Sequence, residues 1–582
     1  MVTDPAAVSV RQEPPRGRRT KRCAAFGLVA ALAPAMLSSC AQSGTHLGPT
    51  ISVDRTFYVS AGGDDRADGR AADRAWRSLD RVNSERLVPG DRVLLEGGTR
   101  FVGSLSLDAR DAGDATNLVT VASYGAGRAT IAPDPMGRSA ISVHNTAGIR
   151  IQDLIVSGGD MASTPADGIN LFNDRPGGGV LDRVEIVGVE VSGFANGIVI
   201  GAGAGRAGFR RVEVRDAMLH DNRRAGLAAY GPPFDPAAPA YAHEDITVSA
   251  VDAFHNEGER GATTNTGSGI VLGSVRGGVV EDSTAHDNGA ASTAQQGPIG
   301  IWAYDSTRIV MQRNVAFDNR TQFADGGGFG LDQNTSDSSL QYNLSYGNDG
   351  GGYLLFTNQP NGFHRGNVVR FNISSEDARN GANYGGFMVG GGFAGPATAT
   401  VVRGDQIYQN TVVMTGHDGQ FPPAVRVAGT LADVQLRNNI IVAAQGAPLV
   451  NTGDVTADGV QFQGNDYSGG DGRFDVQWRG SSFTSLQAWQ SSTGQEILEN
   501  RPMGLVIDPR LADPRPPTGV RSASQRGDAT GFRLQPGSPV ATAGIALATR
   551  FGTATGGQDF FAQQVSTTQP PIGASTAASG PR

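Results

Sequence analysis

The sequence predicts an all-β solenoid, a fold in which short parallel strands stack coil upon coil. Between Gly300 and Asn358 the chain repeats one pattern three times. In each copy a glycine is followed by residues whose side chains point alternately inward and outward, and the inward ones are apolar. Asn314, Asn343 and Asn372 recur every 29 residues, and periods in this range are typical of solenoids. Each unit is too short to bury a core alone, so stacking must supply it.

The regular spacing of asparagines continues in both directions along the chain. Further copies are Asn222, Asn256, Asn288, Asn319, Asn410 and Asn439. Identical asparagines stacked at a corner hydrogen-bond to one another and to the turn backbone, so we interpret them as structural ladders. His220, His255 and His286 fall beside these asparagines. We expect these histidines to follow the same stack rather than to bind a metal.

The entry segment and the coils together resemble a known superfamily. "FYVSAGGDDRADG" begins at Phe57 and "LVPGDRVLLEGGTRFVGSLSL" at Leu87, and many coils end in Asp-Asn or His-Asn. This pattern resembles the right-handed parallel β-helix superfamily, which includes pectate-lyase-like proteins, over roughly residues 55–475. The resemblance implies a right-handed solenoid with an N-terminal cap. Members of the superfamily include lyases, epimerases, hydrolases and binding proteins, so the chemistry must be argued from the site.

The N-terminal segment is typical of an exported lipoprotein. A basic stretch precedes an apolar run that ends at Leu37-Ser38-Ser39-Cys40, which resembles a bacterial lipobox. We expect residues 1–39 to be a signal peptide, Cys40 to be lipidated and residues 40–54 to form a tether. An ordinary signal peptide with a chance cysteine is the alternative. The protein is therefore expected to be lipid-anchored to the bacterial cell envelope or secreted, with no other membrane contact.

Five regions are expected along the chain. After the signal peptide and tether, residues 55–475 form the β-helix, 476–566 a small C-terminal extension with irregular and αβ segments, and 567–582 a disordered tail. Ser78 is a candidate N-cap for a short helix that covers the first coil. Four inserts within the coils, such as "NEGERGATTNTGSG" and "SEDARNGANYGG", are expected to form the walls of a binding face.

Charge and composition limit the binding partners and the catalytic bases that the protein can have. The 582 residues include 56 acidic and 48 basic ones, for a net charge of −8, so a nucleic-acid partner is not expected. Lys21 is the only lysine, and it lies in the predicted signal peptide. A lysine base is thus excluded from the mature chain. Removal of Cys23 with the signal peptide would leave one cysteine and no disulfide, and we expect a monomer.

Aligning the strands by their glycines places two columns of side chains on the outer face of one sheet. One column contains Phe172, Tyr230, Tyr304, Asp332 and Phe356, with Gly201 and Gly273 between them. Its neighbour contains Asn170, Val199, Ala228, Val271, Trp302, Gly330, Leu354, Met388 and Arg426. Exposed rings beside an acid suit a pyranose ring, so we predict a polysaccharide groove in which Trp302, Tyr230, Phe356 and Arg426 bind substrate. Stacking of these rings under an inserted turn is the alternative.

Candidate catalytic residues are Asp332, Asp305, Asp325 and Tyr304. Asp305 and Asp332 are expected as a carboxylate pair on adjacent rungs, with Asp325 on the preceding turn, as a glycoside hydrolase would need. Asp305 and Asp325 could instead simply cap turns. For a lyase, Tyr304 could serve as the base if its pKa were lowered, and Ca²⁺ is the candidate cofactor. Lyase, hydrolase and non-catalytic glycan binding all remain open from the sequence.

Overall fold

The structure is a computed structural model that describes residues 54–133, 138–159, 166–203, 205–359, 361–380, 384–391, 402–455, 459–470 and 472–577. The predicted signal peptide, Cys40 and nearly all of the predicted tether lie outside the described residues.

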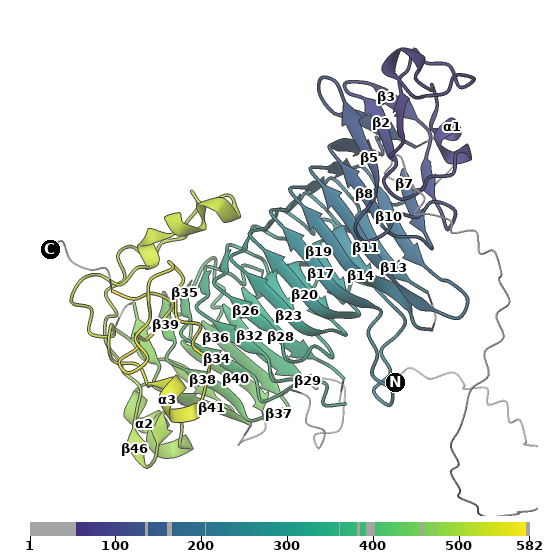
Figure 1. Ribbon diagram of the computed structural model, residues 1–582. Helices are drawn as coiled ribbons and strands as arrows, with labels where there is room; N and C mark the ends of the chain where they lie inside the picture. Colours follow the sequence, from purple (N-terminus) through teal and green to yellow (C-terminus); the bar gives the residue numbers. More distant parts are fainter. Residues whose placement is uncertain are drawn as a thin grey trace, which may run out of the picture. The chain divides into compact units, whose positions relative to one another are not determined.

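Three long sheets run along the described chain, and successive coils contribute strands to them in turn, as the stacked arrows of Figure 1 show. Sheet 1 contains β1 (Thr56–Val59), β2 (Arg92–Glu96), β5 (Val119–Tyr124), β8 (Ile149–Gln152), β11 (Gly179–Val187), β14 (Ala207–Arg215), β17 (His243–Ser249), β20 (Val275–Glu281), β23 (Thr307–Gln312), β26 (Ser339–Gln341), β30 (Val368–Arg370), β34 (Gln406–Tyr408), β38 (Val434–Arg437) and β41 (Val460–Gln463).

Sheet 2 contains β3 (Arg100–Val102), β6 (Ala129–Ala132), β9 (Leu154–Ser157), β12 (Glu190–Ser192), β15 (Met218–His220), β18 (Asp252–Phe254), β21 (Thr284–His286), β24 (Val315–Phe317), β27 (Leu344–Tyr346), β31 (Ile373–Ser375), β35 (Thr411–Thr415), β39 (Ile440–Ala444) and β42 (Asp466–Gly469).

Sheet 3 contains β4 (Leu105–Leu107), β7 (Ile141–His144), β10 (Ile169–Asn173), β13 (Asn196–Ala202), β16 (Ala225–Tyr230), β19 (Ser268–Gly273), β22 (Ile299–Tyr304), β25 (Gly327–Leu331), β28 (Tyr353–Thr357), β32 (Phe387–Gly391), β36 (Val425–Gly429), β40 (Val450–Val455), β43 (Val476–Trp478) and β44 (Ser481–Phe483). Two small sheets are formed by β29 (His364–Arg365), β33 (Val402–Arg403) and β37 (Leu431–Ala432), and by β45 (Ile497–Leu498) and β46 (Arg501–Pro502).

Strand alternation buries one face of each of the three long sheets. In β22, Ile301 and Ala303 are fully buried in the interior, while Trp302 and Tyr304 lie on the outer face. Adjacent strands of the three long sheets pair in parallel, apart from the terminal β43–β44 pair, which is antiparallel. The chain is a right-handed parallel β-helix, and the predicted all-β solenoid is confirmed.

Asparagine ladders join the coils at their corners, as predicted. The Nδ2 of Asn256 donates to Oδ1 of Asn288 at 2.9 Å, and Asn288 donates likewise to Asn319 at 3.0 Å. Asn348 extends this ladder, which ends on the buried carboxylate of Asp377. A second ladder runs from Asn314 through Asn343, Asn372, Asn410, Asn439 and Asn465 to Glu496. These side chains satisfy buried turn backbone in coil after coil.

Two of the three histidines belong to a column of stacked rings. The rings of His220 and Phe254 are 4.8 Å apart and nearly parallel, and those of His286 and Phe317 are 4.7 Å apart. The rings of Phe254 and His286 are also stacked, at 5.1 Å. His255 instead meets Phe254 edge-on and lies 3.9 Å from Asp221. These contacts agree with the interpretation that the three histidines are structural.

The N-terminal cap contains α1 (Leu79–Ser84), and Ser78 caps it as expected, since its Oγ accepts a hydrogen bond from the Arg81 N–H. Asp64 pairs with Arg66, Asp68 pairs with Arg74, and Asp65 accepts hydrogen bonds from Ser78. Across the described residues, no group of three or more His, Cys, Asp or Glu side chains could hold a metal ion.

After β44 the chain leaves the coils. It forms α2 (Leu486–Thr493), with Ser485 as N-cap, and later α3 (Leu547–Phe551), both at the green-to-yellow end of Figure 1. Three-residue or longer 3-10 turns lie at Ala72–Arg74, Ala523–Asp528 and Thr530–Phe532. None of the helices in the described part of the chain is long and apolar enough to cross a membrane.

The expectation of a disordered tail from residue 567 is wrong for its first eleven residues. Ile572 and Ala574 are buried against the outer face of sheet 2, in a cluster that includes Ile440. The Gly573 N–H donates to the Asn438 carbonyl at 2.8 Å. The composition of this segment is that of a disordered chain, yet the solenoid side supplies an apolar surface to cover. Residues 578–582 lie outside the described chain.

Candidate active site

A cavity of about 740 Å³ lies on the outer face of sheet 3. Its floor is formed by strands from β13 to β36, and its walls come from two of the predicted inserts and from the turn before β22. Thr264 and Asn265 belong to one insert, Gln295 and Gln296 to the turn before β22, and Tyr384 to the "SEDARNGANYGG" insert. A concave site with convergent polar groups on an apolar floor is typical of ligand pockets.

The two predicted columns form the floor in the expected register. Trp302 pairs with Val271 on one side and Gly330 on the other, and the column continues through Leu354 and Met388 to Arg426. The expectation of a fully solvated strip is wrong for Trp302, which is only 7% exposed. Its indole packs in a small apolar cluster outside the sheet, and its Nε1 donates to Ser268 Oγ at 3.1 Å. The floor is therefore apolar and preformed.

Glycine makes room for the aromatic column. A Cβ added to Gly273 would lie 2.4 Å from Cζ of Tyr304, so the tyrosine ring lies across that glycine. The Trp302 and Tyr304 ring centroids are 5.2 Å apart. Tyr230, which is 38% exposed, lies over Gly201 in the same way. Phe356 is half-buried on the far side of the cavity floor.

Asp325 lines the cavity from the turn before β25. The Tyr384 hydroxyl donates to its Oδ1 at 2.8 Å, and the Gly297 N–H donates to its Oδ2 at 3.0 Å. The same tyrosine oxygen accepts from the backbone N–H of Asp325, so the residue is held at both ends. Burial raises the pKa of the Asp325 carboxyl, and the two donors act against that rise.

Asp332 lines the same cavity from the residue after β25. Its N–H continues the sheet by donating to the Ala303 carbonyl, and its Oδ1 accepts from the Gln333 N–H at 2.7 Å. Burial and the charge of nearby Asp325 raise the pKa of Asp332 to about 7, against the opposing effects of Gln333 and His364. The charge of Asp325 thus raises the proton affinity of Asp332, as is typical of acids that share a site.

Asp305 does not join this pair in the way that we expected. It is absent from the described cavity lining, has a left-handed backbone with φ 47°, and accepts from Asn334 Nδ2 at 2.6 Å. These features are those of an Asp that stabilises a turn, the alternative that the sequence left open. Asp305 still contributes charge, because it adds to the raised pKa of Asp332. Within the cavity, the acid beside Asp332 is Asp325.

Tyr304 does not have the lowered pKa that a catalytic base would need. Burial, with a smaller effect of Asp305, raises the pKa of its phenol to about 12. The hydroxyl is therefore neutral at physiological pH and suited to hydrogen bonding and ring contacts. Arg426, the last predicted binding residue, lines the cavity and donates to Asn451 Oδ1.

The sequence interpretation missed several residues of the site. Tyr384, which orients Asp325, lies in an insert that was recognised only as a candidate wall. Arg224 lines the cavity and donates from Nε to Glu259 at 3.0 Å. His364 lies behind Asp332, fully buried. Tyr384 and Asp325 are 59 positions apart, and no repeat pattern relates them.

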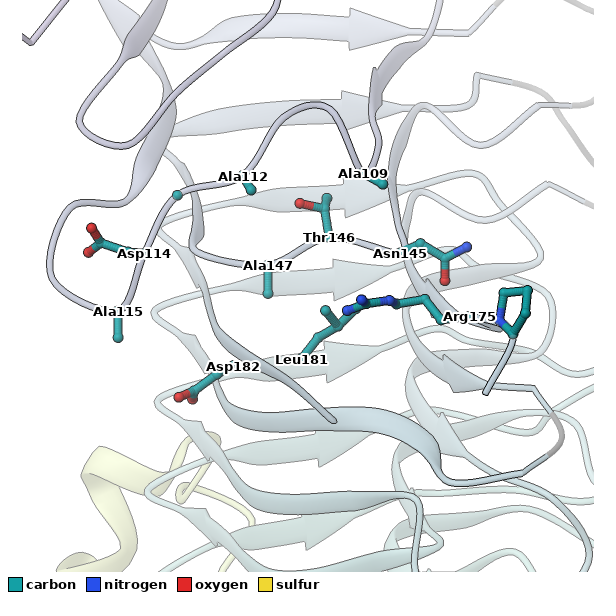
Figure 2. Close-up of a pocket in the computed structure, with 12 residues that line it drawn as sticks. Ala109, Ala112, Asp114, Ala115, Asn145, Thr146, Ala147, Arg175, Leu181 and Asp182 are labelled. Carbon is teal, nitrogen blue, oxygen red and sulfur yellow. The ribbon is translucent and has the colours of Figure 1, made fainter. Parts of the chain in front are cut away.

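A second pocket, of about 600 Å³, lies on the early coils. Its lining combines alanines with polar and charged residues, and Figure 2 shows Asp114 and Asp182 on one side of it and the chain of Arg175 on the other. Its charged groups are spread apart rather than converging on one point. The cavity on sheet 3 is the better candidate for an active site.

Comparisons with known proteins give one curated relative and several similar structures. No protein-family model matches the chain. A lacto-N-biosidase of Bifidobacterium longum subsp. longum is 38% identical over 107 residues, which is 18% of this chain and 7% of the length of that relative. The match thus spans a small part of the relative.

Among solved structures, the native GH136 lacto-N-biosidase from Eubacterium ramulus is 18% identical, with a TM-score of 0.48, over 70% of this chain and 68% of that one. Pectate lyase Pel9A is 16% identical, with a TM-score of 0.40, over 91% and 98%. The mannuronan C-5 epimerase AlgE4 A-module of Azotobacter vinelandii is 16% identical, with a TM-score of 0.39, over 72% and 91%. Similarities at this level carry no information on activity.

Proposed function

We propose that the protein is a carbohydrate-active enzyme that hydrolyses glycosidic bonds of an oligo- or polysaccharide in the cavity on sheet 3. The observation that carries this proposal is the pair of carboxyls, Asp325 and Asp332, in the wall of an aromatic-floored cavity. Hydrolysis of a glycosidic bond needs one protonated and one ionised carboxyl on either side of the anomeric carbon. A carboxyl whose pKa is raised to about 7, with a second carboxyl in the same cavity, meets that need.

The reaction follows from the two protonation states. The protonated carboxyl gives its proton to the glycosidic oxygen as the bond from that oxygen to the anomeric carbon breaks. The ionised carboxyl either attacks the anomeric carbon, forming an ester that water then opens, or removes a proton from the attacking water. In both routes water adds across the broken bond. The Tyr384 hydroxyl and the Gly297 N–H orient Asp325 for its part in this exchange.

The aromatic floor supports sugar as the substrate class. Tyr304, Tyr230 and Phe356 offer ring surfaces against which the C–H face of a pyranose packs, and the nearly buried Trp302 supports them from the floor. Asn265, Gln295 and other polar wall residues add hydrogen-bonding groups for hydroxyls.

A lyase is supported less well by the same residues. The raised pKa of Tyr304 disfavours it as the base of a β-elimination, and the mature chain is expected to contain no lysine. Arginine would remain as the base, and its high proton affinity makes it a poor one. The activity in the name of the curated relative, a lacto-N-biosidase, is compatible with hydrolysis but comes from a match over a small part of that protein.

The test is cleavage of a panel of neutral and acidic glycans by the protein lacking residues 1–39. We expect new reducing ends without the ultraviolet absorbance of unsaturated products, and we expect Asp332→Asn and Asp325→Asn each to lose this cleavage. Asp305→Asn is the matched control, since its carboxyl lies off the cavity lining, and it should keep most activity. Unsaturated products would show elimination instead, and binding without cleavage would show a non-catalytic glycan-binding protein.

The roles within the pair are separable with an activated aryl glycoside. The variant that lacks the general acid should still cleave it, because a good leaving group needs no proton. The variant that lacks the nucleophile or base should not. The configuration of the first product distinguishes direct attack by water from the two-step route.

We also propose that the protein is exported and held at the cell envelope through lipidated Cys40, as a monomer. The lipobox-like sequence and the basic, apolar leader support this proposal. A Cys40→Ser variant should move from the membrane fraction to the soluble fraction. Unchanged fractionation would contradict the anchor, and sedimentation of the protein would test the monomer.

A further inference from the structure

We propose that Arg426 forms a subsite for an anionic group of the glycan, a carboxylate or a sulfate, so that the enzyme prefers acidic over neutral substrates. This inference rests on the proposed function, because it assigns a substrate class to the same cavity. It goes beyond that function by naming the residue that binds the negatively charged group of the glycan.

Arg426 lies on β36, at the end of the floor column that contains Trp302. Gly330, Leu354 and Met388 lie between the two residues on successive strands. Strands in a sheet are about 4.8 Å apart, so Arg426 lies about 14 Å along the axis from the strand before Asp332. Arg426 would therefore meet a ring farther along the same glycan rather than the ring bound at the carboxyl pair.

The guanidinium is held in place from behind. One terminal nitrogen donates to Asn451 Oδ1, and Asn451 in turn donates to Gln477 on the next strand. A Cβ on Gly453 would lie 3.2 Å from the other terminal nitrogen, so the absence of a side chain there leaves space for the guanidinium. Two residues of successive coils thus orient the arginine, which is half-buried in the cavity wall. Such preorganisation lowers the cost of binding a ligand.

No carboxylate of the described chain neutralises Arg426. Arg224, at another part of the cavity, pairs with Glu259, and Arg320 pairs with Asp318 and Asp349. Arg426 forms no such ion pair with any described residue, and its Nε is buried without a hydrogen-bond partner among them. Burial lowers its pKa, with no acid acting in the other direction. A half-buried arginine normally has a carboxylate or another anion beside it.

The geometry of a guanidinium selects the chemistry of its ligand. Its planar donors match the two oxygens of a carboxylate or of a sulfate, and hydrogen bonds between charged groups are stronger than those to neutral hydroxyls. Uronic acids and sialic acids supply a carboxylate, and sulfated sugars supply a sulfate. Both sources present the same chemistry to Arg426.

The experiment measures binding apart from cleavage. The Asp332→Asn protein, with and without Arg426→Met, is titrated calorimetrically with an oligogalacturonate, a sialylated oligosaccharide, a sulfated oligosaccharide and the neutral counterpart of each. We expect the anionic members of at least one pair to bind better, and Arg426→Met to weaken that binding by about tenfold to a hundredfold while leaving neutral binding unchanged. The pair that responds identifies carboxylate or sulfate as the source.

Arg403→Met is the matched control, because Arg403 is exposed on β33 and outside the cavity lining. It should leave all affinities unchanged. Equal binding of anionic and neutral glycans, equal effects of the two substitutions, or absence of binding to every glycan would each overturn the inference. The titration does not depend on turnover, so the two proposals can fail separately. If the proposed hydrolysis is wrong, Arg426-dependent binding stays intact while the cleavage assay of the wild-type protein gives no reducing ends.

Discussion

The imidazole of His364 donates a hydrogen bond from Nδ1 to the backbone carbonyl of Asp332, at 3.3 Å. Its Nε2 lies 2.9 Å from the carboxylate of Asp405, and both His364 and Asp405 are fully buried. Because both ring nitrogens face acceptors, the ring is suited to the doubly protonated form. Burial opposes that charge, but Asp405 raises the pKa of His364 overall. His364 thus lies behind Asp332 with a raised pKa, and it is not among the residues that line the cavity.

His364 should act as a positioning residue for Asp332. The positive imidazolium lowers the pKa of Asp332, so a neutral replacement should raise the pKa of the carboxyl pair. We expect His364→Gln to shift the pH profile of kcat/KM to higher pH, by about one unit or less, and to lower the maximum by a smaller factor than Asp332→Asn does. The profile, measured with one glycan, checks this.

The control for that prediction is His255→Gln. His255 is largely exposed at the other side of the coils, beside Asp221, so its loss should leave the profile in place. If His364 were merely structural, His364→Gln would lower the melting temperature and the activity at every pH alike, with no movement of the profile.

Gly273 should be needed for activity more than for folding. A methyl group there would meet the Tyr304 ring at 2.4 Å, and the ring would have to leave its place over the glycine. We expect Gly273→Ala to cost about 1–3 kcal/mol of stability, as overpacking does, and to weaken glycan binding clearly. Thermal unfolding and calorimetric titration measure the two effects.

Gly519→Ala is the matched substitution, because a Cβ there meets nothing within 4 Å and the backbone has no positive φ. It should change neither quantity. If Gly273→Ala binds glycan as tightly as the wild-type protein, the position of the Tyr304 ring is irrelevant to the site.

The fold and the floor of the site could be predicted because strand stacking turns sequence spacing into position. Once the glycines were aligned, the period of two fixed which residues share a column, and the structure has Trp302, Leu354, Met388 and Arg426 in the predicted order. Asp332 entered the site by the same logic. The sequence therefore predicts the positions of residues that lie on the repeated strands.

The inserts were expected to form the walls of the site, but the individual wall residues that act there could not be predicted because inserts do not repeat. Tyr384 reaches Asp325 from an insert two coils away, and no spacing rule relates the two. The alignment of columns also does not predict burial. Trp302 and Tyr304 lie on the outer face, yet Trp302 is nearly buried and burial raises the pKa of Tyr304 instead of lowering it. The order of the tail was missed for a related reason, since its burial depends on the solenoid surface beneath it.

Asp377, at the end of an asparagine ladder, should make stability depend on pH. Burial raises its pKa to about 7, while Ser374 and Asn348, which donate at 2.6 and 2.7 Å, oppose the rise. A carboxyl whose pKa is higher in the folded state binds more protons there, so its protonated form stabilises the fold. This contribution is present below its unfolded pKa near 4 and is lost as pH rises toward about 7.

We therefore expect the melting temperature to fall between about pH 4 and pH 7, and Asp377→Asn to reduce that fall, because an amide stays neutral throughout. Melting curves at several pH values measure it. Asp332, Asp466 and Glu496, whose pKa values are also raised to about 7, leave part of the dependence in place. The exposed acid Asp528 is the control; an equal effect of Asp528→Asn would contradict a special role of the ladder end.

Deleting residues 567–582 should destabilise the protein, although their composition is that of a disordered tail. The deletion removes the buried side chains of Ile572 and Ala574 from the outer face of sheet 2. It also leaves the Asn438 carbonyl and Thr411 Oγ1 without the N–H groups of Gly573 and Ala574 that they accept from. Loss of one large buried side chain costs about 2–5 kcal/mol, so a clear drop in melting temperature is expected. A shorter deletion, of residues 578–582, removes none of these contacts and should leave the melting temperature unchanged. Equal melting temperatures for the long deletion and the full chain would mean that sheet 2 is stable without this cover.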